Sequence, residues 1–132
     1  MSALPACFAT FLAGWNEPDP VRMRHLFEQA LTPDVAFTDP NYQIVGIEAF
    51  IEQVNDFRAE EPGSRLAPAS GVDMHHDRAR YGWVVLRADG TRFEGFDAVA
   101  LDLDQGKICR IDGFFGPLPS AGTARVVQQS EA

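Results

Sequence analysis

Asp97, an aspartate in the middle of a predicted strand, has a side chain that could act as an acid or a base. Along residues 93–103, alternation places Asp97 on the same side as Val99 and Leu101. A carboxylate among apolar side chains must lose its charge, find hydrogen-bond partners or take part in chemistry. We therefore expect Asp97 to face a ligand-binding cavity, or else to be a hydrogen-bonded carboxylate of the core.

A second aspartate repeats this pattern in a shorter segment. Asp39 follows Val35 and Phe37 at alternate positions and directly precedes Pro40. It is either an Asx-turn residue, whose side chain caps the bend at Pro40, or a base that faces a pocket. Together, Asp39 and Asp97 predict a cavity capable of acid–base chemistry.

The elements that must position these two residues are helices first and strands later. Apolar residues recur at helical spacing within residues 4–15, 23–31 and 50–57. Asp19 followed by Pro20 is typical of a helix start. The second half changes to a period of two, which predicts strands over residues 66–75, 80–87, 93–103 and 107–115, after shorter strands at 35–39 and 42–46.

This order predicts an α+β domain, with three N-terminal helices packed on one face of a curved, mostly antiparallel sheet. We expect a single domain over residues 1–116. Residues 117–132 have little apolar content, so we expect a flexible C-terminal tail.

Composition excludes several classes of function. The chain has 132 residues, of which 45% are hydrophobic and ten are Phe, so it can bury a core with a cavity. Its net charge of −8 repels phosphate backbones and anionic lipid headgroups, and we expect neither nucleic acid nor membrane as a partner. No stretch has the length of a membrane span.

Cysteine usage and the first residues indicate the compartment. Two cysteines, Cys7 and Cys109, do not make a disulfide framework, and we expect both to be reduced thiols. Residues 1–14 lack the basic leader of a signal peptide. We therefore expect a cytoplasmic protein.

The element order and several short motifs resemble the SnoaL-like branch of the nuclear transport factor 2-like superfamily. That fold is a cone of three helices closed by a strongly bent sheet. The matching motifs are Phe-Thr-Asp-Pro at 37–40, Gly46 before a helix, His75-His76 before Arg80 and Trp83, Gly-Phe-Asp at 95–97, and Gly-Lys-Ile at 106–108 followed by Gly-Phe-Phe at 113–115.

The resemblance implies roles for the two aspartates. Relatives include ketosteroid isomerases, polyketide cyclases, epoxide hydrolases, dehydratases and non-catalytic binding proteins. By likeness to ketosteroid isomerase, Asp39 before Pro40 is the general base, and Asp97 is a neutral acid that donates a hydrogen bond to an enolate. Two departures argue against the named enzymes: Phe11 stands where the isomerase has a tyrosine, and Gly95 where the epoxide hydrolase has an arginine.

We expect a cavity shaped by aromatic and apolar side chains around a flat, hydrophobic ligand. The ligand-binding candidates are Phe11, Trp15, Tyr42, Phe57, His75, Trp83, Val99 and Phe115. We expect no metal, because adjacent histidines in a strand point to opposite faces, and no cofactor. Arg80 is expected either to bind a substrate carboxylate or to pair with Asp73 or Asp112.

Two hypotheses of function follow. The first is a cofactor-independent isomerase, cyclase or dehydratase that acts next to the carbonyl of a small hydrophobic molecule. The second is a non-catalytic ligand-binding or dimeric interaction module of the same fold. Phe96, Ala98 and Phe114 fall on the sheet face opposite to Asp97, which favours a homodimer through that face.

Overall fold

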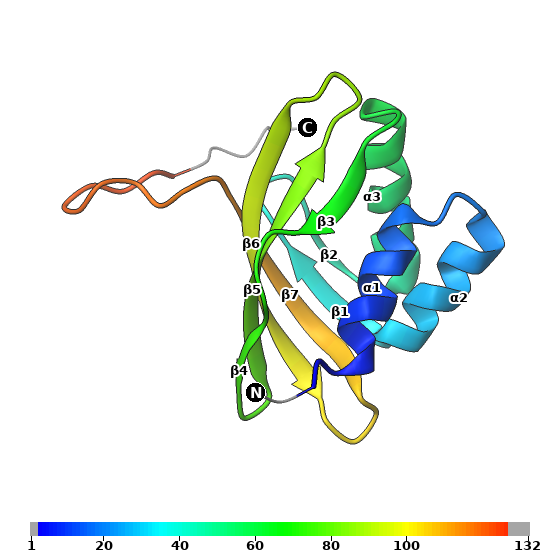
Figure 1. Ribbon diagram of the computed structural model, residues 1–132. Helices are drawn as coiled ribbons and strands as arrows, with labels where there is room; N and C mark the ends of the chain where they lie inside the picture. The colour runs from blue at the N-terminus through cyan, green and yellow to red at the C-terminus, as the bar shows by residue number, and fades with distance from the viewer. Residues whose placement is uncertain (1–2, 127–132) are drawn as a thin grey trace.

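Three helices lie against one face of a single curved sheet, as Figure 1 shows. The computed structural model describes residues 3–126. The helices are α1 (Ala6–Asn16), α2 (Pro20–Ala30) and α3 (Ile47–Glu60). The strands are β1 (Leu31–Thr38), β2 (Gln43–Val45), β3 (Arg65–Pro68), β4 (Asp73–His75), β5 (Arg78–Leu86), β6 (Arg92–Asp102) and β7 (Lys107–Phe115).

The sheet runs in the order β2-β1-β7-β6-β5-β3, and β4 pairs with the first part of β5. The pairing of β1 with β7 is parallel and all the others are antiparallel. This long-range pairing brings the end of β1 beside the end of β7, so that Thr38 lies opposite Asp112. The predicted α+β architecture is therefore confirmed.

A cluster of phenylalanine rings joins the helices to the sheet. The Phe50 ring of α3 contacts the rings of Phe11, Phe27 and Phe37, with centroids 5.8, 5.1 and 5.2 Å away. Phe27 and Phe50 are fully buried. Aromatic pairs at these separations add to the free energy gained by burying the rings, so this cluster fixes the helices on the sheet.

Helices α1 and α2 approach each other closely at Gly14. A Cβ atom at this position would lie 2.6 Å from the Phe27 ring, closer than carbon atoms can pack. The glycine therefore lets the α2 ring lie directly against the α1 backbone. Position 14 belongs to the buried face of α1 with Cys7 and Phe11.

Two element boundaries differ from the prediction. The strand predicted over residues 66–75 is two strands, because the chain bends at residues 69–72 and Gly82 donates its N–H to Ser70 Oγ at 2.8 Å. Leu31, expected in the second helix, begins β1 instead. Pro33 is tolerated there because the β1–β7 register shifts between Leu31 and Ala36.

The tail predicted for residues 117–132 is described only to Val126; residues 127–132 lie outside the described part. The described stretch leaves the end of β7 and runs away from the sheet in Figure 1. Arg125 folds back there and donates to the carbonyl oxygens of Phe115 and Pro117, both at 3.0 Å. None of the helices within residues 3–126 has the length and apolar character that crossing a membrane requires.

We predict that Gly14→Ala destabilises the protein by about 1–3 kcal/mol, the range found for overpacked cores. The added methyl group must displace the Phe27 ring, and this cost exceeds the gain in helix propensity of about 1 kcal/mol. Urea unfolding followed by circular dichroism measures the change.

Gly71→Ala is the matched control, because a Cβ there meets nothing within 4 Å. It should leave the unfolding midpoint almost unchanged. Equal stability of Gly14→Ala and the wild type would contradict the close packing of α1 on α2.

Candidate active site

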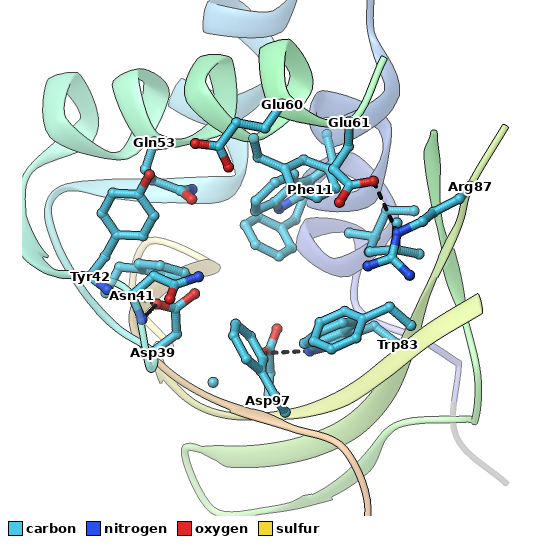
Figure 2. Close-up of a pocket in the computed structure, with 18 residues that line it drawn as sticks. Phe11, Asp39, Asn41, Tyr42, Gln53, Glu60, Glu61, Trp83, Arg87 and Asp97 are labelled. Carbon is cyan, nitrogen blue, oxygen red and sulfur yellow. Dashed lines mark hydrogen bonds and ion pairs between the residues drawn. The ribbon is translucent and has the colours of Figure 1, made fainter. Parts of the chain in front are cut away.

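A cavity of about 260 Å³ lies between the helices and the concave face of the sheet. Figure 2 shows side chains of α3 on one wall and those of β5 and β6 on the other. Most of its lining is apolar or aromatic, from Phe11, Trp15, Phe37, Phe57, Leu66, Trp83, Val85, Phe93 and Phe115. The polar part of the lining comes from Asp39, Asn41, Tyr42, Gln53, Glu60, Glu61, Arg87 and Asp97. A mainly apolar cavity with polar groups at defined places is typical of sites for small molecules.

Asp97 lies on the sheet wall of this cavity and is held by two donors from β5. The Tyr81 hydroxyl donates to Asp97 Oδ2 and Trp83 Nε1 donates to Asp97 Oδ1, each at 3.0 Å. Tyr81 lies directly opposite Asp97 in the β5–β6 register, and Trp83 lies two residues further along the same face. The pairing of the two strands thus builds the carboxylate and its donors as one unit.

Gly95 makes the Trp83 contact possible. Trp83 lies opposite Gly95 in the register, and a Cβ at position 95 would lie 2.2 Å from the indole ring. The ring therefore occupies the space that a side chain at position 95 would fill, and from there its N–H reaches Asp97, two residues further along β6. This packing explains in physical terms why no arginine, or any other side chain, fits at position 95.

The surroundings of Asp97 raise its pKa to about 6, mainly because burial penalises the charged form. The hydrogen bonds from Tyr81 and Trp83 act in the opposite direction, and the charges of Asp39 and Asp112 raise the pKa further. Asp97 is consequently a carboxylate at neutral pH, but one that accepts a proton readily.

These contacts bear on the expectation that Asp97 is a neutral hydrogen-bond donor. An indole N–H can only donate, so Asp97 Oδ1 must accept, and the Tyr81 hydroxyl occupies Oδ2. Burial and the nearby charge raise the pKa of Tyr81 well above its ordinary value, so this hydroxyl keeps its proton. Both oxygens of Asp97 thus accept a hydrogen bond from within the fold.

Asp39 both forms an Asx turn and faces the cavity, the two placements that the sequence left as alternatives. Its Oδ1 accepts the backbone N–H groups of Asn41 and Tyr42, both at 2.8 Å, which is an Asx turn. The side chain also lines the cavity. Burial raises the pKa of Asp39 despite the two backbone hydrogen bonds.

Gly113 brings the two carboxyl groups together. It lies opposite Asp97 in the β6–β7 register. A Cβ at position 113 would lie 3.1 Å from Asp97 Oδ1 and 3.2 Å from Asp39 Cβ. The absence of a side chain at this one position leaves Asp39 and Asp97 facing the same space, visible at the sheet wall in Figure 2.

Of the predicted ligand-binding residues, six line the cavity: Phe11, Trp15, Tyr42, Phe57, Trp83 and Phe115. Two do not. His75 is exposed on β4, because the bend after β3 carries this segment away from the cavity, and Val99 is buried in the core beyond Asp97. Arg80 pairs with Asp73 at 2.9 Å on the exposed face of the sheet and does not reach the cavity.

Sequence reasoning missed six polar residues at or behind the cavity: Asn41, Gln53, Glu60, Glu61, Tyr81 and Arg87. Tyr81 could have been found from Trp83, which was predicted: the two are two residues apart in one strand, so alternation places both side chains on the same face of the sheet. Gln53 lies between Phe50 and Phe57 on the apolar stripe of α3, a spacing that signals an inward polar residue. Arg87 and Glu61 form an ion pair at 3.0 Å where the cavity meets the end of α3. The Arg87 guanidinium also lies 5.4 Å from the centre of the Phe93 ring.

Comparison with solved structures identifies the family. A candidate isomerase of the SnoaL-like family from Agrobacterium tumefaciens is 32% identical to this chain, with a TM-score of 0.77. The match covers 84% of this chain and 95% of that one. The chain belongs to the SnoaL-like family. No protein-family model matches the sequence, and no curated protein sequence does.

More distant structures agree with this SnoaL-like assignment at the level of the fold. A candidate ketosteroid isomerase from Kribbella flavida is 19% identical, with a TM-score of 0.64 over 97% of this chain and 90% of that one. A candidate polyketide cyclase from Sinorhizobium meliloti is 14% identical, with a TM-score of 0.68 over 83% and 94%. The predicted nuclear transport factor 2-like fold is thereby confirmed.

The raised pKa predicts how Asp97 affects stability. Because the folded state holds a proton on Asp97 up to about pH 6, against 3.8 for the ordinary value, this residue makes the protein less stable as pH rises from about 4 to 6. Asp97→Asn removes the titration. The stability of the variant relative to the wild type should therefore increase between pH 4 and pH 7.5, by up to about 3 kcal/mol.

Urea unfolding at the two pH values measures this difference, and any constant cost of the amide cancels. Tyr81→Phe is the companion variant: it removes a donor to the carboxylate, so the pH dependence of its stability should be steeper than that of the wild type. A relative stability of Asp97→Asn that does not change with pH would contradict the raised pKa.

Proposed function

We propose that this protein is a cofactor-independent enzyme that moves a proton next to the carbonyl group of a small hydrophobic molecule. The observation that carries this proposal is the pair of carboxyl groups, Asp39 and Asp97, that flank Gly113 in a largely aromatic cavity. Membership of the SnoaL-like family, with a candidate isomerase as a relative, supports it. Isomerisation, aldol-type cyclisation and dehydration all begin with such a proton transfer.

Asp97 is the base in this proposal. Its carboxylate removes a proton from the carbon beside the carbonyl, and the C–H electron pair moves onto the carbonyl oxygen to give an enolate. Asp97 becomes a neutral acid, and returning its proton at the same or another carbon restores the carboxylate. A base with a pKa of about 6 combines ionisation at neutral pH with high basicity, which general-base catalysis requires.

Asp39 is the second proton carrier. Asn41 and Tyr42 hold its Oδ1, which fixes the carboxyl group and leaves Oδ2 for the cavity. Burial raises its pKa as well, so Asp39 accepts a proton more readily than an exposed aspartate does. Two carboxyl groups of this kind can take a proton at one carbon and deliver it at a neighbouring one.

A non-catalytic binding module is the second candidate function. The Asx turn at Asp39 and the Tyr81 and Trp83 hydrogen bonds at Asp97 satisfy both carboxylates structurally. In that case the cavity binds a hydrophobic molecule and no proton is transferred. The experiment below separates the two candidates, because binding and exchange are measured on the same samples.

Deuterium exchange from solvent into 2-decalone, 1-tetralone and cyclohexanone tests the proposal. The wild type should accelerate exchange at the carbon beside the carbonyl of at least one ketone. Asp97→Asn should lower this rate by about 100-fold or more, the usual contribution of a positioned base. Asp39→Asn should also lower it. Proton NMR follows the loss of signal.

Asp73→Asn is the control, since this carboxylate is exposed on β4 and pairs only with Arg80 at the surface. It should exchange like the wild type. Ketones that bind without accelerated exchange in the wild type would support the binding module, and exchange unaffected by Asp97→Asn would remove Asp97 as the base.

We also propose that two copies of the chain associate through the outer face of the sheet. Phe96 and Phe114 lie opposite each other on β6 and β7 and are 52% and 62% exposed. Ala98 extends the same exposed face. The cytoplasm remains our proposed compartment, on the sequence argument alone.

The paired change Phe96→Asp and Phe114→Asp should convert a dimer to a monomer, because the carboxylates would be desolvated in the interface. Light scattering after size exclusion gives the mass. Val21→Asp, at an exposed position of α2, is the control and should keep the mass of the wild type. A monomeric wild type at micromolar concentration would contradict the proposal.

A further inference from the structure

Two buried hydrogen-bond donors on the helix wall of the cavity have no partner among the described residues. They are Gln53 Nε2 on α3 and Trp15 Nε1 on α1. Both side chains line the cavity, and Gln53 is only 3% exposed. A buried polar group without a partner lowers stability, so such groups in a cavity wall point to a ligand that completes them.

These two side chains belong to the same part of the wall. Gln53 lies three residues after Phe50 and four before Phe57, so all three share one face of α3. The Trp15 ring contacts both phenylalanines edge-on, with centroids 5.8 and 5.7 Å away. The indole is therefore packed against the stretch of α3 that carries Gln53, and the position of its N–H group is fixed.

The two N–H donors and the two aspartates lie on different walls, and the helix wall also carries Glu60 and Glu61 at the end of α3, where Glu61 pairs with Arg87. Figure 2 shows Gln53 extending from α3 and Asp97 extending from the sheet, with the cavity between them. A ligand between Gln53 and Asp97 meets an N–H donor on one side and an aspartate carboxylate on the other. A ketone has a matching pair of groups, since its oxygen accepts hydrogen bonds and the adjacent C–H can lose a proton.

We propose that Gln53 and Trp15 bind the carbonyl oxygen of the substrate and stabilise the negative charge that forms there. This inference rests on the proposed function, because Asp97 must remove the proton that generates the charge. It also specifies the substrate class: a neutral, hydrophobic ketone whose oxygen faces the helices and whose acidic C–H faces the sheet. Fixed donors in a dry cavity are the usual means of stabilising an enolate.

Under this proposal, Trp15 and Gln53 supply the hydrogen-bond donors that a tyrosine hydroxyl at position 11 would otherwise supply. Trp15 lies one helical turn after Phe11 and lines the same cavity, so α1 still presents a donor, although one turn further along. Together with Gln53, it forms a site that depends neither on a tyrosine at position 11 nor on a protonated Asp97.

Carbon-13 NMR of 2-decalone labelled at the carbonyl carbon tests this inference directly. Hydrogen bonds to the oxygen polarise the carbonyl, so the wild type should move its signal downfield on binding. Gln53→Met, which keeps the length of the side chain but removes its polar atoms, should reduce that shift and weaken binding about three- to tenfold. Its thermal midpoint should not fall, because the change removes an unpartnered buried group.

Trp15→Phe is the second variant and should also reduce the downfield shift while the protein stays folded. Gln29→Met, at an exposed position of α2, is the control and should match the wild type. If Gln53→Met and Trp15→Phe both retain the full downfield shift of the bound carbonyl, the inference is wrong, whatever the exchange rates show.

Asp97→Asn separates this inference from the proposed function. It should abolish deuterium exchange but keep the downfield shift, because the donors are on the other wall. A downfield shift without exchange in the wild type would overturn the enzymatic function and support the oxygen site alone. A wild type that leaves the signal of 2-decalone unchanged at millimolar ketone would overturn the oxygen site.

Discussion

The carboxylate of Asp97 is the constraint around which the rest of the site is built. A charged group on the wall of an aromatic cavity is tolerated only with hydrogen bonds to both oxygens, and Tyr81 and Trp83 supply them. Each donor depends on the pairing of the two strands. Tyr81 reaches the carboxylate because it lies directly opposite Asp97, and Trp83 reaches it because the residue opposite its ring is Gly95, which has no side chain. A one-residue slip between β5 and β6 would remove both, so strand register and site geometry are set together.

The two walls of the cavity divide the chemistry between them. The sheet wall carries the two aspartates, because parallel pairing of β1 with β7 brings Asp39 next to Gly113, opposite Asp97. The helix wall carries aromatic rings and N–H donors, because α1 and α3 pack through the Phe50 cluster. Residues far apart in sequence therefore meet through the fold alone, and neither wall has the whole site.

Local patterns predicted much of this arrangement. Strand alternation put Asp97 on the cavity side, and helical periodicity found all three helices. Contacts that depend on how two strands pair, or on where the chain bends, could not be predicted from such patterns. The hydrogen bond from Tyr81 requires the β5–β6 register, and the removal of His75 from the cavity requires the bend at residues 69–72. The raised pKa of Asp97 follows mainly from its burial and is moderated by Tyr81 and Trp83, and strand alternation reveals neither effect in full.

The position of the donors bears on how one fold can support different reactions. In this chain the first helix has an apolar ring at Phe11 and an indole N–H one turn later, while α3 adds an amide at Gln53. Moving the donors along the helix wall leaves the sheet wall unchanged, since Asp97 is held entirely from β5. The proposed base and the proposed oxygen site are thus built on separate elements. Under the proposed function, substitutions on α1 and α3 can alter which carbonyl compound fits without disturbing the carboxylate of Asp97.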